Sequence, residues 1–301
     1  MRLYLLPLST RRTFLYAQRL HITTTRTDAS YIDRGAAWAA RKWSQWEKQE
    51  SGWQKKVVEY GNHAFRRIPY EEWGLKSVPA LSSRRRKEEI EGAEQVEVVF
   101  PRGVLGSGEQ DERVIDTVRR LGVEREGLHR RRLMWCFVGM PITAPFALVP
   151  VIPNLPFFYL VYRAWSHWRA ISGGKHIQWL VEKKLLKPTP SPILDALYSQ
   201  AAVKAKLQRQ QPSGVDKETL LLTQEQVRTF SESLDVPALE IELERAIWQV
   251  EQAIQKSDGA GAEAEAEAAK DGIEAQKSGK QEPKHKMTEK EMGSDGKEKK
   301  L

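Results

Sequence analysis

The residues of this sequence that could do chemistry gather at the end of one long apolar segment. Asn154 and Tyr159 lie within residues 133–162, which carry no charged side chain, and Arg163 and His167 follow directly. Polar and ionisable groups at such a border are costly to hold and mark functional sites, so these four are our candidate functional residues at a membrane border. His167 follows Arg163 by one helical turn, where it could titrate as a pH sensor or only hydrogen bond locally.

Other patterns that would indicate catalysis or metal binding are missing from the sequence. Cys136 is the single cysteine, which excludes a disulfide framework and a multi-cysteine zinc site. Residues 103–108 have the glycines of a phosphate loop but lack its Lys-Ser/Thr ending. Paired carboxylates, a nucleophile motif and metal-ligand spacings are likewise not found. We therefore expect a protein that is not an enzyme and has no cofactor or metal.

The composition is polar and basic around this one apolar segment. Its 301 residues carry a formal net charge of +8, and 29% of them are charged. The mean hydropathy is −0.56 and the isoelectric point is about 9.4. A basic surface suits acidic partners, either RNA or anionic lipid, and charge alone does not choose between them.

The apolar segment itself predicts a membrane hairpin. As one straight helix, its thirty residues would be about 45 Å long, against about 30 Å for the hydrocarbon core of a bilayer. Its five prolines disfavour a straight helix, and arginines flank both ends, which places both ends on one side of a membrane. A single kinked span and a buried pair of soluble helices are the alternatives. The expected membrane-interface anchors are Arg131, Arg132, Trp135, Trp165 and Trp168.

The amino terminus has the composition of a mitochondrial targeting segment. Residues 1–27 contain five arginines and no acidic side chain. Alternatively, residues 2–8 are a retained β-strand that pairs with residues 96–100, and the two interpretations are compatible.

The rest of the chain is predicted to be helical. We expect a mainly α, membrane-associated protein with a Pro-rich apolar hairpin and at most a short two-stranded sheet. The tail is too poor in large apolar side chains to fold stably. The expected parts are a basic matrix-facing helical region (28–132), the hairpin or kinked span (133–162), post-membrane helices (163–209), a helical pair (216–256) and a disordered tail (257–301).

Four stretches of the sequence resemble the mitochondrial potassium/proton exchange-related family. They are residues 151–168 (VIPNLPFFYLVYRAWSHW), residues 172–176 (SGGKH), residues 67–76 (RIPYEEWGLK) and residues 1–10. The resemblance covers roughly residues 1 to 255. It implies an inner-membrane protein associated with potassium/proton exchange, a process that controls matrix volume, and it assigns no binding residues.

The functional expectation is an accessory or regulatory component of this exchange, with its soluble regions facing the matrix. The expected partners are inner-membrane lipids, other membrane proteins of the exchange system and a possible second copy of the chain. The alternative is a membrane-anchored scaffold that tethers matrix RNA or ribosomes through its positive charge. Substitution of Arg163 or His167 is expected to impair exchange.

Overall fold

The computed structural model describes residues 1–18, 31–49, 51–82, 86–87, 90, 95–105, 110–145, 154–199, 203 and 218–278. The chain divides into two compact units, Met1–Ile254 and Gln255–Leu301, and the elements that position the site belong to the first. That unit is built on a four-stranded mixed sheet in the order β2-β1-β3-β4. β1 and β2 are antiparallel, whereas β3 is parallel to both β1 and β4. The strands are β1 (Arg2–Pro7), β2 (Thr13–Gln18), β3 (Val96–Phe100) and β4 (Leu186–Pro190).

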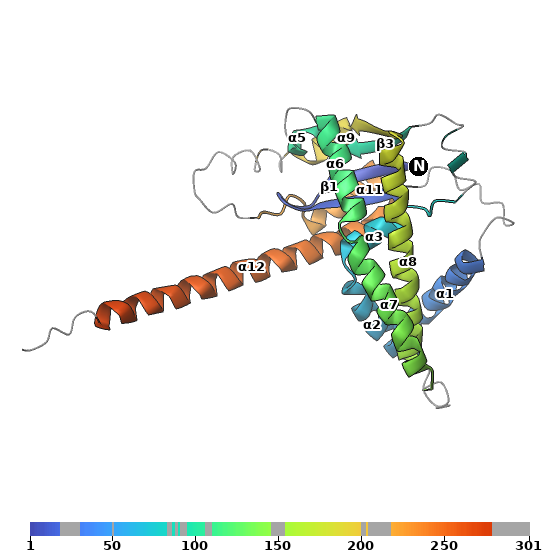
Figure 1. Ribbon diagram of the computed structural model, residues 1–301, viewed down its shortest axis with the longest axis horizontal. Helices are drawn as coiled ribbons and strands as arrows, with labels where there is room; N and C mark the ends of the chain where they lie inside the picture. Colours follow the sequence, from blue (N-terminus) through green and yellow to red (C-terminus); the bar gives the residue numbers. More distant parts are fainter. Residues whose placement is uncertain are drawn as a thin grey trace, which may run out of the picture. The chain divides into compact units, whose positions relative to one another are not determined.

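Helices cover the sheet on both faces (Figure 1). On one face the sheet packs with α3, α6 and α8, and on the other with α9, α11 and the first part of α12. The helices are α1 (Tyr31–Glu47), α2 (Trp53–Arg66), α3 (Tyr70–Ser77), α5 (Arg102–Leu105), α6 (Gln110–Val123), α7 (Glu126–Thr143), α8 (Leu155–Glu182), α9 (Pro192–Leu197), α11 (Val227–Ser233) and α12 (Pro237–Ser278), with a 3₁₀ turn at Gln224–Gln226.

The near-continuous apolar run of β1 follows from this double cover. Successive side chains of a strand point to opposite faces, so a strand buried on both faces needs apolar residues throughout. Leu3 and Leu5 lie in the core beneath α3, α6 and α8, and Tyr4 and Leu6 lie in the core on the other face. β4, with two prolines, lies at an edge, where a missing amide donor is tolerated.

α8 passes its neighbours at backbone contact, and glycine makes this possible. A Cβ atom at Gly173 would lie 2.0 Å from the carbonyl oxygen of Leu75 in α3. A Cβ atom at Gly174 would lie 2.5 Å from the carbonyl oxygen of Gly122 in α6. The Gly-Gly pair of the SGGKH stretch therefore sets how closely α8 approaches both helices.

The membrane-associated helical fold predicted from the sequence is wrong. The two ends of the apolar segment are the last turns of α7 and the first turns of α8, which pack against each other. In the described part of the chain, no helix has both the length and the apolar composition needed to cross a bilayer. Within the segment Cys136 and Asn154 are buried, whereas many apolar side chains, including Met134, Trp135 and Phe158, are exposed. The middle of the predicted hairpin, residues 146–153, lies outside the described residues.

One further expectation about the fold needs correction. The sheet has four strands rather than two, although the predicted pairing of the amino-terminal strand with residues 96–100 is present as β1 and β3. α12 continues to Ser278, into the segment expected to be disordered, and the disorder of the tail stays a prediction. Residues 279–301 lie outside the described residues.

The amino-terminal segment contributes two strands to the core. Leu3, Leu5, Phe14 and Leu15 are all buried, with at most 4% of any of these residues exposed. The folded unit therefore depends on residues that also carry the composition of a targeting segment. Targeting itself stays a prediction.

Candidate functional site

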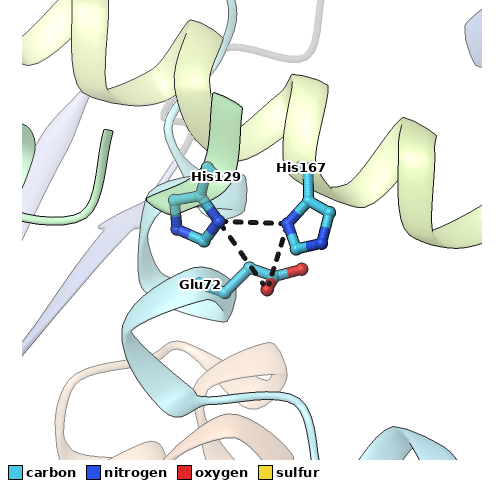
Figure 2. Close-up of side chains that lie close together, drawn as sticks. All are labelled: Glu72, His129 and His167. Carbon is cyan, nitrogen blue, oxygen red and sulfur yellow. Dashed lines mark hydrogen bonds and ion pairs between the residues drawn. The ribbon is translucent and has the colours of Figure 1, made fainter. Parts of the chain in front are cut away.

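Four ionisable side chains from three helices meet in the interior of the protein. Glu72 comes from α3, His129 from α7, and Arg163 and His167 from successive turns of α8. All four are buried, with 8% or less of each residue exposed. Figure 2 shows both imidazoles facing each other above the Glu72 carboxylate. We call these four residues the buried charged centre.

An ion pair between Glu72 and Arg163 holds the centre together. The guanidinium donates to both carboxylate oxygens, over 2.7 Å from Nη1 to Oε1 and 3.0 Å from Nη2 to Oε2. The hydroxyl of Ser166 also donates to Oε1. Burial alone would raise the pKa of Glu72, but the hydrogen bonds and charge of Arg163 outweigh burial and lower it. Glu72 is therefore ionised at neutral pH although water does not reach it.

The two histidines extend this pair into a hydrogen-bonded chain. Nη2 of Arg163 lies 3.1 Å from Nε2 of His167, and Arg163 can only donate, so this nitrogen must accept. A neutral His167 then carries its proton on Nδ1 and donates to Nδ1 of His129 over 3.0 Å. Nε2 of His129 is left as the donor, and it has no partner among the described residues. The order of the chain is thus Arg163, His167, His129.

Both histidines are held neutral by their surroundings. Burial lowers the pKa of His167 to about 4, and the charge of Arg163 acts in the same direction against that of Glu72. Burial also lowers the pKa of His129, opposed by Glu72 and assisted by Arg125, Arg132 and Arg163. The centre therefore carries one positive and one negative charge at neutral pH.

Glu72, His129 and His167 are also the residues that could hold a metal ion. One ligand atom from each lies within 4.8 Å of the others, and imidazole with carboxylate is a donor set that zinc accepts. Arg163, however, occupies both oxygens of Glu72 and the second nitrogen of His167. A cation here would face a guanidinium and would have to displace its hydrogen bond to His167. The arrangement therefore favours the hydrogen-bonded chain over a metal centre.

An open groove of about 400 Å³ leads from the surface to the centre. It lies between the end of α2, the middle of α7 and the first half of α8. We call it the arginine groove, because three arginines line it and none of its lining residues is acidic. The lining is Ala64, Arg67, Ile68, Pro69, Arg132, Trp135, Cys136, Tyr159, Leu160, Arg163 and His167.

Lys76 lies one turn after Glu72 on α3 and is also buried. Its ammonium lies 3.4 Å from the centroid of the Trp73 ring and donates to the hydroxyl of Tyr162 over 3.2 Å. Burial lowers the pKa of Lys76 to about 7, and the charges of Glu72 and Glu242 oppose this change. Arg163 and Arg245, which also face it, lower it further.

This lowered pKa predicts how stability varies with pH. Between pH 7 and 10.5 the folded protein releases the Lys76 proton while the unfolded chain keeps it. The unfolded state then binds more protons, so the free energy of unfolding rises with pH, by up to about 1.4 kcal/mol per pH unit. We expect the wild type to gain roughly 2 kcal/mol over Lys76→Met between pH 7 and about pH 9, measured by urea unfolding. Identical pH slopes for the two proteins would contradict this assignment.

The structure brings together two of the four candidate residues and separates the other two. Arg163 and His167 are adjacent members of the buried charged centre. Tyr159 is 43% exposed and lines the arginine groove. Asn154 instead caps α8: its side chain accepts from the amide of Phe157 over 3.1 Å and donates to the carbonyl of Thr143 over 2.6 Å.

The cap at Asn154 therefore ties the start of α8 to the end of α7. Asn154→Ala removes both hydrogen bonds, and we expect a loss of about 1–2 kcal/mol in stability. Asn154→Asp keeps the acceptor for Phe157 and should lose less. Chemical denaturation of the three proteins tests this order, and an alanine variant as stable as the aspartate variant would contradict it.

The five expected anchors lie on α7 and α8. Arg131, Arg132 and Trp135 are exposed on α7, and Arg132 and Trp135 line the groove. Trp168 is 41% exposed, whereas the indole nitrogen of Trp165 is buried and has no partner among the described residues. Their role as membrane anchors stays a prediction.

Glu72 and His129 were not among the residues predicted from the sequence. Glu72 is within the RIPYEEWGLK stretch. That stretch indicated the family, but it gave no functional role to Glu72. His129 lies four residues before Leu133, outside the apolar segment and outside the four stretches that resemble the family. Neither residue is near Arg163 in sequence, so only the packing of α3 and α7 on α8 brings them there.

Comparison with known proteins identifies the family. Residues 2–181 match the family described as mitochondrial K+-H+ exchange-related, and the chain belongs to this family. The match includes every residue of the buried charged centre. The family name associates the chain with mitochondria and with potassium/proton exchange.

Two fungal proteins are similar to the chain. The uncharacterized protein YDL183C of Saccharomyces cerevisiae is 26% identical over 282 residues, covering 84% of this chain and 85% of the yeast protein. The uncharacterized protein C23H3.12c of Schizosaccharomyces pombe is 28% identical over 174 residues, covering 58% of this chain and 72% of its own length. No solved structure matches the chain.

Proposed function

We propose that this protein is an accessory or regulatory component of potassium/proton exchange at the mitochondrial inner membrane, and so of matrix volume homeostasis. The observation that carries the proposal is the family match over residues 2–181. That match contains the whole buried charged centre and all the residues of the arginine groove. The proposal places the folded unit on the matrix side and assigns it no catalytic step.

The charges at the site favour regulation over binding of the transported cation. Potassium entering the groove would meet Arg67, Arg132 and Arg163, and like charges repel strongly where water is partly excluded. The carboxylate of Glu72 is already bound by Arg163. A site for potassium needs free oxygen ligands, and this one offers an occupied carboxylate behind arginines.

The buried charged centre is the part through which we propose that the protein acts. A buried ion pair adds little stability over a well-packed apolar replacement, so stability alone does not explain this network. Its hydrogen bonds join α3, α7 and α8. Anything that shifts one of these helices would alter the network and thereby change the surface that a partner contacts.

Swelling of mitochondria in potassium acetate tests the proposed function. Acetic acid and exchange together load the matrix with salt, so the swelling rate reports potassium/proton exchange. We expect mitochondria without this protein to swell more slowly, and an added potassium/proton ionophore to restore the rate. Normal swelling together with defective mitochondrial translation would contradict the proposal and favour an RNA or ribosome scaffold.

A further inference from the structure

The arginine groove has a cationic side that is open to a ligand. Arg67 and Arg132 are both exposed, and in the described part of the chain neither is paired with a carboxylate. The guanidinium of Arg67 lies 3.1 Å from Nε2 of the His63 imidazole. Arg163, at the inner end, is neutralised by Glu72, so the two outer arginines supply the net charge of the groove.

The rest of the lining of the groove is mainly apolar. It includes Ala64, Ile68, Pro69, Trp135 and Leu160. A volume of about 400 Å³ is within the range of small-molecule sites. A ligand that fills the groove must therefore combine an anionic group with an apolar part.

Apolar side chains are also exposed on α7 and α8. Trp135 is 63% exposed and Tyr159 is 43% exposed, and both also line the groove. Their neighbours in sequence, Met134 on α7 and Phe158 on α8, are 63% and 61% exposed. Exposed apolar side chains in one place mark a binding surface, and tryptophan and tyrosine are enriched where protein meets the headgroup layer.

The arginines and the apolar lining together fit a lipid that carries a phosphate group. Arginine binds phosphate through paired, charge-assisted hydrogen bonds. A free phosphate ion would use Arg67 and Arg132 but leave the apolar lining in water. An anionic phospholipid would place its phosphate between the arginines and its acyl chains along Trp135, Leu160 and the exposed apolar side chains of α7 and α8.

We propose that the arginine groove binds the headgroup of an anionic phospholipid, with the lipid still in the surface of a bilayer. This contact needs no membrane-spanning helix. It is independent of the exchange function, because a lipid contact serves any protein that works at this membrane.

Flotation of the purified full-length protein with vesicles tests the proposal. The vesicles are phosphatidylcholine with or without phosphatidylglycerol. The variants are Arg132→Gln and Arg67→Gln, and the control is Arg119→Gln, which removes the same charge from an exposed position on α6 outside the groove. Equal thermal unfolding temperatures would establish that all the variants are folded.

We expect the wild type to float only with the anionic vesicles. Arg132→Gln and Arg67→Gln should each bind at least about tenfold more weakly than Arg119→Gln, because each removes charged hydrogen bonds to the phosphate in addition to net charge. Equal weakening by all three variants would overturn the proposal in favour of general surface charge. Displacement from the vesicles by inorganic phosphate at matched ionic strength would overturn it in favour of a free-phosphate site.

Discussion

Glu72→Gln is expected to destabilise the protein by about 3–5 kcal/mol, because it leaves the guanidinium of Arg163 buried without a counter-charge. The substitution keeps the shape of the side chain, so the loss reports the charge and not a cavity. Urea unfolding followed by circular dichroism measures the difference.

Two further variants separate the buried pair from charge loss in general. Glu71→Gln changes the neighbouring residue, whose pair with Arg125 is more exposed, and should cost less than about 1 kcal/mol. Replacing both buried partners, Glu72→Leu with Arg163→Met, should recover most of the stability, because two apolar side chains leave no charge unpaired. A loss below about 1 kcal/mol for Glu72→Gln would contradict the buried pair seen here.

Gly173→Ala is expected to cost about 3 kcal/mol, the upper end of the range for overpacking. The added Cβ would lie 2.0 Å from the carbonyl oxygen of Leu75, a backbone atom that cannot rotate away. α8 would have to separate from α3, and these two helices carry Arg163 and Glu72. The variant should therefore also weaken the buried charged centre.

Gly35→Ala in α1 is the matched control for this substitution. No atom lies within 4 Å of a Cβ at Gly35, so alanine should stabilise the helix by about 0.5–1 kcal/mol. Thermal unfolding of both variants measures the contrast. A Gly173→Ala protein as stable as the wild type would show that α8 and α3 are not in backbone contact.

The sequence predicted those parts of the fold whose signals are local. The expected helical pair of residues 216–256 contains α11 and the first part of α12, where Leu239, Leu243, Ala246, Ile247 and Val250 are buried. Gln226 accepts from the amide of Thr223 over 3.1 Å in a capping box at its start. Caps and helix periodicity depend on residues a few positions apart, so a single sequence contains them.

The elements that were not predicted lie in stretches whose sequence fits two different structures. β2 lies in a basic, acid-free stretch that equally suits a targeting segment. β4 contains Pro188 and Pro190, which are excluded from central strands but allowed at an edge. The apolar segment suited a membrane hairpin by its length and composition, but in the described part of the chain neither α7 nor α8 is long and apolar enough to cross a bilayer.

Two of the four residues of the buried charged centre were predicted, because only those two are close in sequence. Arg163 and His167 are one helical turn apart, so their proximity follows from the helix alone. Glu72 lies 91 residues before Arg163, and His129 lies 38 residues before His167. Contacts at such separations come from tertiary packing, which motif spacing does not contain.

The most direct test of the central claim is the rate of potassium acetate swelling in deletion mitochondria that express defined variants. The wild type and Arg119→Gln should both restore swelling. The protein with Glu72→Leu and Arg163→Met, present at the same level and folded, should not, because it lacks the buried charged centre. Full restoration of swelling by this variant would contradict the account and leave the centre a structural role only.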